Sequence, residues 1–284
     1  MATKKSAQTG SKRTTKSTRV SSRSSQTAKT KAVLQSNAWN LCLAVVFVLQ
    51  AIAVLVFSHN ANVPVVTHYL TTDSLASQAA GHTILSSAVR KLFDVNIGYL
   101  VAAFLFLSAI IHGLMASLWR KEYEKDLKQR VNKIRWFDYG LSGGLALIVV
   151  ALLNGMYDIS SLFMLFILVV FVCGLALFGE SHTTTPGGKM RTYVAVLVAG
   201  ISAWLTIGLY VAGAIIHGTG LGHYVYVIDA VIGLVSLGIV GNLYLVLRAQ
   251  KRWTDYLFGE RVFMLLSFAA KTALAWLIFA DLLK

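Results

Sequence analysis

A lysine near the middle of an apolar segment is the first residue whose type and position suggest chemistry. Lys271 lies in FAAKTALAWLIF, within a run long and apolar enough for a membrane-spanning helix. An ammonium group at that depth is costly unless an acid pairs with it or it loses its charge. Both conditions suit a lysine that forms a Schiff base with an aldehyde. A lysine paired with an acid for packing alone is an equally good interpretation, so both stay open.

Asp138, in RWFDYGLSGG, is the acid that could balance this charge. The alternative is an acid favoured by the dipole at a helix N-terminus. Asp138 lies near the start of its apolar run and is therefore expected to be shallower than Lys271. We expect two features to close this gap. Residues 128–134 continue the helix outward, with Arg135 reaching back to the surface, and the Lys271 side chain leans toward the N-terminus of its helix.

Four other polar residues lie in or beside the apolar runs. His112, in SAIIHGLMAS, is equally well interpreted as a satisfied core residue or as a group that handles protons. Asp229 lies about one turn inside its run and has no evident role. Asp158 and Glu180 lie at the ends of runs, where capping or solvation at the membrane interface is the favoured interpretation.

The composition requires that most of the chain be embedded in a membrane. Of 284 residues, 56% are hydrophobic and 13% are charged, with a mean hydropathy of +0.65. A soluble domain has about 25% charged residues, so a typical cytosolic enzyme, a disordered chain and a collagen-like fibre are excluded. The long runs and the two prolines favour helices over membrane-spanning strands. The predicted fold class is all-α, an integral membrane bundle of seven helices, at about 39–57, 95–118, 134–153, 160–178, 192–216, 224–246 and 261–282.

The distribution of charge predicts the orientation. One predicted side carries 22 lysines and arginines and the other carries three, which places the N-terminus in the cytoplasm and the C-terminus outside. Residues 1–35 are predicted to be a disordered, basic, Ser/Thr-rich cytoplasmic tail that meets anionic lipid headgroups. A transit peptide is the alternative for this tail. Residues 36–284 are predicted to form the membrane domain, with an outer loop at about 58–94. That loop holds histidines interpreted as solvated rather than metal-binding: His59, His68 and His82.

Several of these segments together resemble one family. Residues 253–261 (WTDYLFGER) and 266–276 closely resemble the last helix and its preceding loop in heliorhodopsins. Residues 135–139 (RWFDY) resemble the family's third-helix motif Arg-Trp-x-Glu-Tyr. His112 stands where the second helix carries a histidine, and Trp204 matches a tryptophan of the fifth helix. The resemblance covers roughly residues 39–284, and the family's N-terminus is cytoplasmic, in agreement with the charge distribution.

The resemblance implies all-trans retinal bound covalently to Lys271 through a protonated Schiff base, with Asp138 as its counterion. Ser267, on the same helix face as Lys271, is implied to hydrogen-bond near the Schiff base. His112 is implied to belong to a polar, water-holding cavity beside it. The other residues implied to surround the chromophore are Trp204, Tyr139, Ser142 and Trp276. For Trp276 an anchor at the membrane interface is an equally good interpretation.

The sequence departs from the family pattern at three places. The counterion is Asp138 where the family usually has glutamate, which shortens the acid by one methylene. The histidine common in the first helix is Phe47 here. The serine-rich run after the third-helix tyrosine is reduced to Gly140, Ser142, Gly143 and Gly144. A less polar environment around the Schiff base is therefore expected.

The implied function is light sensing, with all-trans to 13-cis photoisomerisation, proton transfer from the Schiff base and no net ion pumping. Light-gated or light-driven proton transport is the alternative, and it needs a continuous polar path. A light-dependent regulator of a membrane or cytoplasmic enzyme is the second alternative; no catalytic motif predicts an enzyme. The expected location is the cell membrane, as a multi-pass protein. Expected partners are the lipid bilayer, a second copy in a homodimer and an unidentified cytoplasmic signalling partner, with no nucleic acid.

Overall fold

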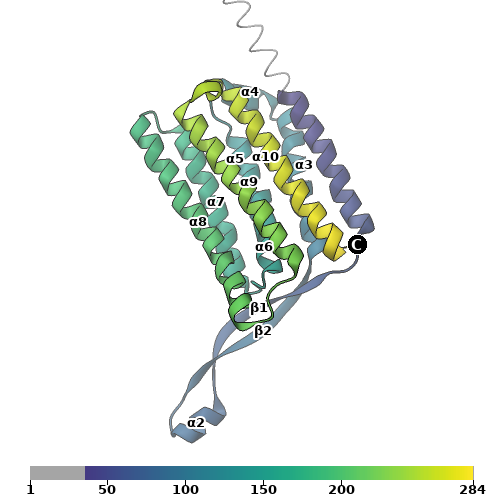
Figure 1. Cartoon of the computed structure of the whole chain (residues 1–284), viewed down its shortest axis with the longest axis vertical. Helices are drawn as coiled ribbons and strands as arrows, with labels where there is room; N and C mark the ends of the chain where they lie inside the picture. Colours follow the sequence, from purple (N-terminus) through teal and green to yellow (C-terminus); the bar gives the residue numbers. More distant parts are fainter. Residues whose placement is uncertain (1–35, 284) are drawn as a thin grey trace, which may run out of the picture.

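The computed structural model describes residues 36–283, which form a helical bundle with a hairpin projecting from one end (Figure 1). The predicted basic tail lies outside the described residues. Seven helices of the described chain are long and apolar enough to cross a membrane, which confirms the predicted bundle. They are Ser36–Phe57, Ile97–Ala116, Lys133–Leu153, Ile159–Ser181, Pro186–His217, His223–Arg248 and Tyr256–Leu283.

The elements follow one another up and down the bundle, and neighbours in sequence pack together, as α7 does with α8 and α9 with α10. After the first helix the order is β1 (Asn62–Thr72), α2 (Ser74–Ala80), β2 (Leu85–Asn96), α3 (Ile97–Ala116), α4 (Arg120–Lys128), α5 (Lys133–Asp138), the π-helical turn η1 (Tyr139–Gly143), α6 (Gly144–Leu153), α7 (Ile159–Ser181), α8 (Pro186–His217), α9 (His223–Arg248), the 3₁₀ turn η2 (Lys251–Thr254), α10 (Tyr256–Ile278) and the π-helical turn η3 (Phe279–Leu283).

Two helices, α8 and α10, begin earlier in the sequence than their apolar runs predicted, because a polar side chain caps each of them. The Thr185 side chain accepts a hydrogen bond from the Gly188 amide, and Pro186 occupies the first turn of α8, where a missing N–H costs nothing. The Asp255 side chain accepts from the Leu257 amide at 3.1 Å and begins α10. The early start of α10 brings its first turns, with Glu260, inside the bundle.

The connection predicted at residues 58–94 forms an antiparallel hairpin, which the all-α prediction did not include. β1 pairs with β2 from Asn62 opposite Asn96 to Thr72 opposite Leu85. Valine and threonine recur along β1, and β-branched side chains favour strands. Figure 1 shows the hairpin extending away from the helices, with α2 at its tip. We call this the hairpin end of the bundle, and the opposite end the α4 end.

The base of the hairpin is fastened to the turn before α7. The Val66 amide donates to the Tyr157 carbonyl at 2.9 Å, and His68 Nδ1 lies 3.1 Å from Asp158 Oδ1. Asp158 also caps α7, because its side chain accepts from the Ser161 amide at 2.9 Å, which confirms the capping interpretation. Burial works to raise the pKa of the Asp158 carboxyl, but the hydrogen bonds from His68 and Ser161 outweigh it and leave the pKa below its ordinary value.

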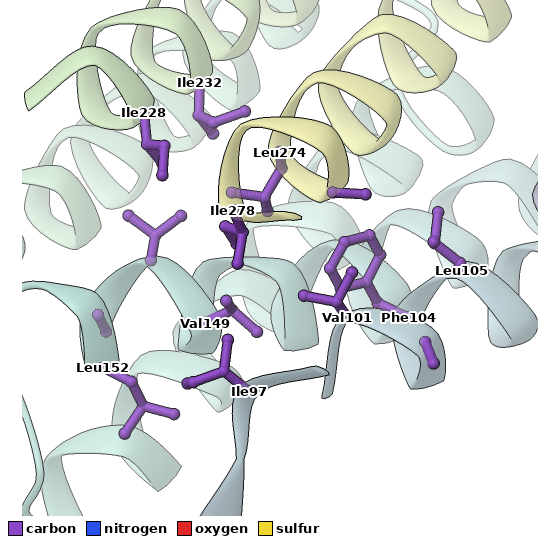
Figure 2. Close-up of a cluster of buried hydrophobic side chains, with 14 of the residues drawn as sticks. Ile97, Val101, Phe104, Leu105, Val149, Leu152, Ile228, Ile232, Leu274 and Ile278 are labelled. Carbon is purple, nitrogen blue, oxygen red and sulfur yellow. The ribbon is translucent and has the colours of Figure 1, made fainter. Parts of the chain in front are cut away.

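Two hydrophobic clusters fill the bundle. The larger one occupies the hairpin half, where side chains from α3, α6, α9 and α10 converge (Figure 2). The smaller one lies toward the α4 end and includes Tyr123, Trp136 and Phe263. Among the buried residues of α3, Ala109 is the last in the larger cluster and Ile111 is the first in the smaller one. Polar side chains gather at the level where the two clusters meet.

The short helix α4 closes one end of the bundle. Its Tyr123 and Leu127 are buried in the smaller cluster, and Asp126 is buried as well, while its lysines are exposed. Glu124 Oε1 accepts from Asn37 of the first helix at 2.8 Å and from Arg120 at 2.9 Å. The hydrogen bond from Arg120 holds the pKa of Glu124 below its ordinary value against a small effect of burial. The residues beneath α4 are thereby shielded from the surface.

Candidate functional site

The lysine and the aspartate singled out in the sequence meet in the interior of the bundle. Lys271 Nζ of α10 lies 2.7 Å from Asp138 Oδ2 at the end of α5, and both side chains are buried. The ammonium also donates to Ser108 Oγ of α3. Burying a charge is tolerated only when it is paired and hydrogen-bonded. The predicted contact between the two residues is therefore present, with Ser108 as a third member.

The backbone around Asp138 fixes the direction of its carboxylate. The π-helical turn η1 follows directly, and Ser142 Oγ lies 2.7 Å from the Asp138 carbonyl and 2.8 Å from its Oδ1. Ser108 Oγ lies 2.7 Å from the same Oδ1. At the end of η1 a Cβ on Gly144 would lie only 2.8 Å from the Phe166 ring, so the close approach of α7 requires a glycine. π-helical turns are frequent at functional sites.

Aromatic rings complete the environment of the Lys271 nitrogen. The centroids of the Phe47 and Tyr139 rings each lie 5.7 Å from Nζ, within the range of cation–π attraction. The Tyr139 hydroxyl donates to the Phe263 carbonyl at 2.6 Å, which holds this ring in place. Phe47 therefore contributes a ring face to the site at the position where the family commonly has a histidine.

A small cavity lined by both polar and apolar side chains continues from this pair toward the α4 end. Its volume is about 10 Å³, about the smallest that holds one water molecule. His112 lines it, with Nδ1 2.8 Å from Asn40 Oδ1 and with Nε2 buried and without a hydrogen-bond partner among the described residues. Ser267 and Glu260 also line the cavity. The cavity links the environment of Lys271 and Asp138 to a second buried ionic group.

That second group is centred on Arg135, which is only 3% exposed. Its Nη2 donates to Glu180 Oε1 at 2.6 Å and its Nη1 donates to Glu260 Oε2. Asn132 Nδ2 donates to Glu260 Oε1 at 2.6 Å, and Trp136 Nε1 donates to Glu180 Oε2 at 2.9 Å. One guanidinium thus bridges two buried carboxylates near the α4 end.

Three expectations about this region are wrong. Residues 128–134 do not continue the helix outward: α4 ends at Lys128, Arg130 has a φ of 61°, and α5 begins at Lys133. Arg135 does not reach the surface, because α4 folds back over it and two glutamates pair with it. Glu180 is likewise a buried partner of Arg135, with 1% side-chain exposure, and not a solvated residue at the membrane interface.

Residues 253–261, the motif at the start of the last helix, hold α10 against α9. Trp253 Nε1 donates to Asn242 Oδ1 at 2.7 Å, and Asn242 Nδ2 donates to the Gly259 carbonyl at 3.0 Å. A Cβ on Gly259 would lie 2.4 Å from Val246 of α9, so the two helices can approach this closely only at a glycine. This contact sets the depth of α10 and hence of Lys271.

The remaining residues suggested by the sequence lie farther from the pair or at its edge. Ser267 is buried one turn before Lys271. Trp204 is half-buried against the larger hydrophobic cluster, close to Gly233 of α9. Trp276 is 40% exposed and packs edge-on against Phe279, 5.4 Å between ring centroids. An outward-facing tryptophan suits an anchor in the membrane.

Two residues of the site, Ser108 and Glu260, were not predicted from the sequence. Ser108 precedes His112 by four residues in an otherwise apolar stretch, so the two share a helix face, and that spacing was a usable signal. Glu260 lies within the last-helix motif, but its burial follows from the early start of α10 and could not be read from the apolar pattern.

Comparisons with known proteins agree with the fold and assign the family. The solved structure of the transmembrane domain of Salpingoeca rosetta rhodopsin phosphodiesterase is similar, with a TM-score of 0.62 at 12% identity, covering 89% of this chain and 87% of that one. Cyanorhodopsin from Tolypothrix sp. NIES-4075 gives a TM-score of 0.55 at 9% identity, covering 89% and 93%. At these identities the likeness shows the fold alone.

No curated protein matches the chain at a significant level. The family model described as Heliorhodopsin matches residues 37–283. Because that match extends over nearly all of the described residues, the chain belongs to the heliorhodopsin family of retinal photoreceptor-type membrane proteins.

Proposed function

We propose that the chain is a light sensor in which Lys271 carries retinal as a Schiff base and Asp138 balances the charge of that linkage. The observation that carries this proposal is the buried contact of 2.7 Å between Lys271 Nζ and Asp138 Oδ2. A primary amine is the group that condenses with an aldehyde. A carboxylate within hydrogen-bonding distance favours the charged form of the resulting nitrogen. The residues present therefore fit the cofactor that the family implies.

Retinal, when bound, supplies the absorption of visible light and the isomerisation from all-trans to 13-cis. The chain's own residues hold a proton at the Lys271 nitrogen and fix its direction. Asp138 accepts the hydrogen bond, and the hydroxyls of Ser108 and Ser142 hold its carboxylate oxygen. Phe47 and the apolar residues around it keep water away from this nitrogen, which strengthens the electrostatic contact.

The cavity beside His112 supports retention of the proton inside the protein. His112 Nε2 has no partner among the described residues and can accept a proton, and the cavity has room for one bridging water. Toward the α4 end the cavity is bounded by the Arg135 ionic group, and toward the hairpin end the larger hydrophobic cluster fills the bundle. A proton that leaves the Lys271 nitrogen thus has a local acceptor. We infer transfer within the bundle without net pumping.

We also propose that the α4 end faces the cytoplasm and transmits the signal. The connection that forms α4 is rich in lysine and arginine, which favours the cytoplasmic side. The Arg135 group lies between the cavity and α4, so a change of charge near His112 acts on the two glutamates that position Arg135. An N-terminal tag that labels only after permeabilisation of cells would support this orientation, and labelling of intact cells would contradict it.

The test is flash photolysis of the retinal-loaded protein with simultaneous measurement of external pH, together with photocurrents in a voltage-clamped cell. Lys271→Ala is the negative control, because it lacks the lysine to which retinal is proposed to attach. We expect a photocycle with transient loss of the visible band, no lasting change of external pH and no steady photocurrent. A steady photocurrent that scales with light would favour the proton-transport alternative. A protein that binds no retinal would remove the light-sensing proposal altogether.

A further inference from the structure

Asn40 and His112 form a buried polar pair that joins the first helix to α3. Asn40, in the helix Ser36–Phe57, has no exposed surface, and His112 is only 4% exposed. His112 Nδ1 lies 2.8 Å from Asn40 Oδ1. The Phe47 ring packs against the imidazole, with 5.9 Å between the ring centroids. These contacts hold the imidazole in a defined orientation against the first helix.

The contact with Asn40 decides which nitrogen of the imidazole carries the hydrogen. A neutral imidazole has one N–H donor and one nitrogen with a lone pair that accepts. The Asn40 oxygen only accepts, so Nδ1, which faces it, must be the donor. A lone pair on Nδ1 would set two acceptors against each other at 2.8 Å. Nε2 is then left with its lone pair, buried and without a hydrogen-bond partner among the described residues.

The neutral charge of the Asn40 amide is as important as its position. A carboxylate at this distance would favour the doubly protonated, charged imidazole, which has no lone pair left to accept a proton. An amide oxygen holds the hydrogen of Nδ1 and adds no charge. When Nε2 takes up a proton, the hydrogen bond from Nδ1 to the amide becomes charge-assisted and therefore stronger. An asparagine thus keeps Nε2 free and also stabilises the imidazole once it is protonated.

We propose that Asn40 is a positioning residue that fixes His112 in the tautomer with its hydrogen on Nδ1, so that Nε2 is the proton acceptor. The inference rests on the proposed function in one respect, which is that His112 accepts the proton in the light. The tautomer itself is a property of the protein in the dark and can be measured without retinal. The competing arrangement turns the amide over, so that Asn40 Nδ2 donates to Nδ1 and the hydrogen lies on Nε2.

Nitrogen-15 NMR of the full chain, labelled at its histidines and purified in detergent, distinguishes the two arrangements. Ring nitrogens with and without a hydrogen differ widely in chemical shift, and His112→Phe identifies the signals of residue 112 by their loss. In the unchanged protein at neutral pH we expect a hydrogen on Nδ1 and none on Nε2. A hydrogen on Nε2, alone or together with one on Nδ1, would overturn the proposal, and this result needs no variant.

Two exchanges at Asn40 test the cause of the tautomer. Asn40→Leu removes the acceptor, and the hydrogen should leave Nδ1 for Nε2, because no other described residue is a partner of Nδ1. Asn40→Asp supplies a charged acceptor, and both nitrogens should then carry a hydrogen. The charged residues that line the same cavity are unchanged in both variants: Asp138, Arg135 and Glu260. An unchanged imidazole in Asn40→Leu, or an unprotonated Nε2 in Asn40→Asp, would contradict the assignment.

Asn37→Leu is the matched control. Asn37 is a buried asparagine one turn earlier on the same helix, and its amide donates to Glu124 at 2.8 Å. The exchange removes an equal side chain without touching the contact with His112, so both nitrogens should keep their signals. A change of tautomer in Asn37→Leu equal to that in Asn40→Leu would show a general effect of packing and contradict the role of Asn40.

Flash photolysis of the retinal-loaded variants separates a failure of this inference from a failure of the proposed function. Asn40→Leu should reduce the fraction of molecules that transiently lose the visible band by about tenfold, the scale of one hydrogen bond to a charged group. Asn37→Leu should leave this fraction unchanged. A tautomer that changes in Asn40→Leu while the flash signal stays intact would support the assignment of Asn40 and contradict His112 as the acceptor. A lost flash signal with an unchanged tautomer would contradict the assignment of Asn40.

Discussion

The exchange Asp138→Asn tests the role of the buried carboxylate most sharply. It removes one negative charge and leaves the size and shape of the side chain nearly unchanged. In the structure this charge lies 2.7 Å from Lys271 Nζ, and both side chains are almost fully buried. A protonated nitrogen at position 271 would then lose its carboxylate partner and keep the hydroxyl of Ser108 and the rings of Phe47 and Tyr139 as neighbours. We expect the nitrogen to lose its proton at a pH where the parent keeps it.

The size of the effect follows from the separation of the charges. Two unit charges about 4 Å apart attract by about 4 kcal/mol when the effective dielectric constant is about 20. A difference of about 1.4 kcal/mol changes an equilibrium tenfold. Loss of the carboxylate should therefore shift the ratio of protonated to neutral nitrogen by roughly a thousandfold at a given pH. A shift of this size lowers the pH at which the nitrogen loses its proton by about three units.

The assay is the absorption spectrum of the retinal-loaded protein at neutral pH. The parent should absorb in the visible, and Asp138→Asn should absorb mainly in the near-ultraviolet. Asp138→Glu retains the charge and should keep a visible band. Asp229→Asn makes the same chemical change at a different acid and should also keep it. The spectra are recorded with and without chloride, because a bound anion can replace the carboxylate. A visible band retained by Asp138→Asn in both conditions, together with its loss in Asp229→Asn, would refute the counterion assignment.

Two further predictions concern the ends of the bundle. Arg135→Gln leaves buried carboxylates, including Glu260, without their cation, and it should destabilise the fold by about 3–5 kcal/mol; thermal unfolding measures this, and an unchanged melting temperature would contradict it. Asp158→Asn removes the charge that His68 and Ser161 stabilise. Because the folded pKa of Asp158 is depressed, its contribution should be complete above about pH 4 and lost as the pH falls further through the folded value. A melting-temperature difference between parent and variant that persists unchanged at lower pH would contradict this.

The helices of the bundle could be predicted from the sequence because long apolar runs determine where a chain can cross a membrane. Their ends could not be predicted as well, since they depend on single polar caps such as Thr185 and Asp255 outside the runs. The hairpin was missed because residues 58–94 mix polar and apolar side chains without a long run. Its pairing is fixed by contacts between residues far apart in that segment, such as Asn62 and Asn96.

The contact between Lys271 and Asp138 could be predicted because charged residues within apolar runs need partners. The rest of the site depends on the rotation and depth of the helices. The π-helical turn after Asp138 and the close contact at Gly259 determine this rotation and depth. Neither feature can be predicted from the spacing of apolar residues in the sequence. Arg135 was expected at the surface because basic residues precede it. Its burial follows from the return of α4 across the end of the bundle, a tertiary contact that local sequence does not encode.

The proposed light sensing depends on the attachment of retinal to Lys271, and chemical trapping can locate that attachment. The protein is loaded with all-trans retinal and treated with borohydride, which reduces the imine to a stable secondary amine. Peptide mass spectrometry then locates the added group. We expect it on the peptide that contains Lys271 and expect Lys271→Ala to form no visible pigment while still folding. A retinyl group on a different lysine, or a stable visible pigment in Lys271→Ala, would contradict the account.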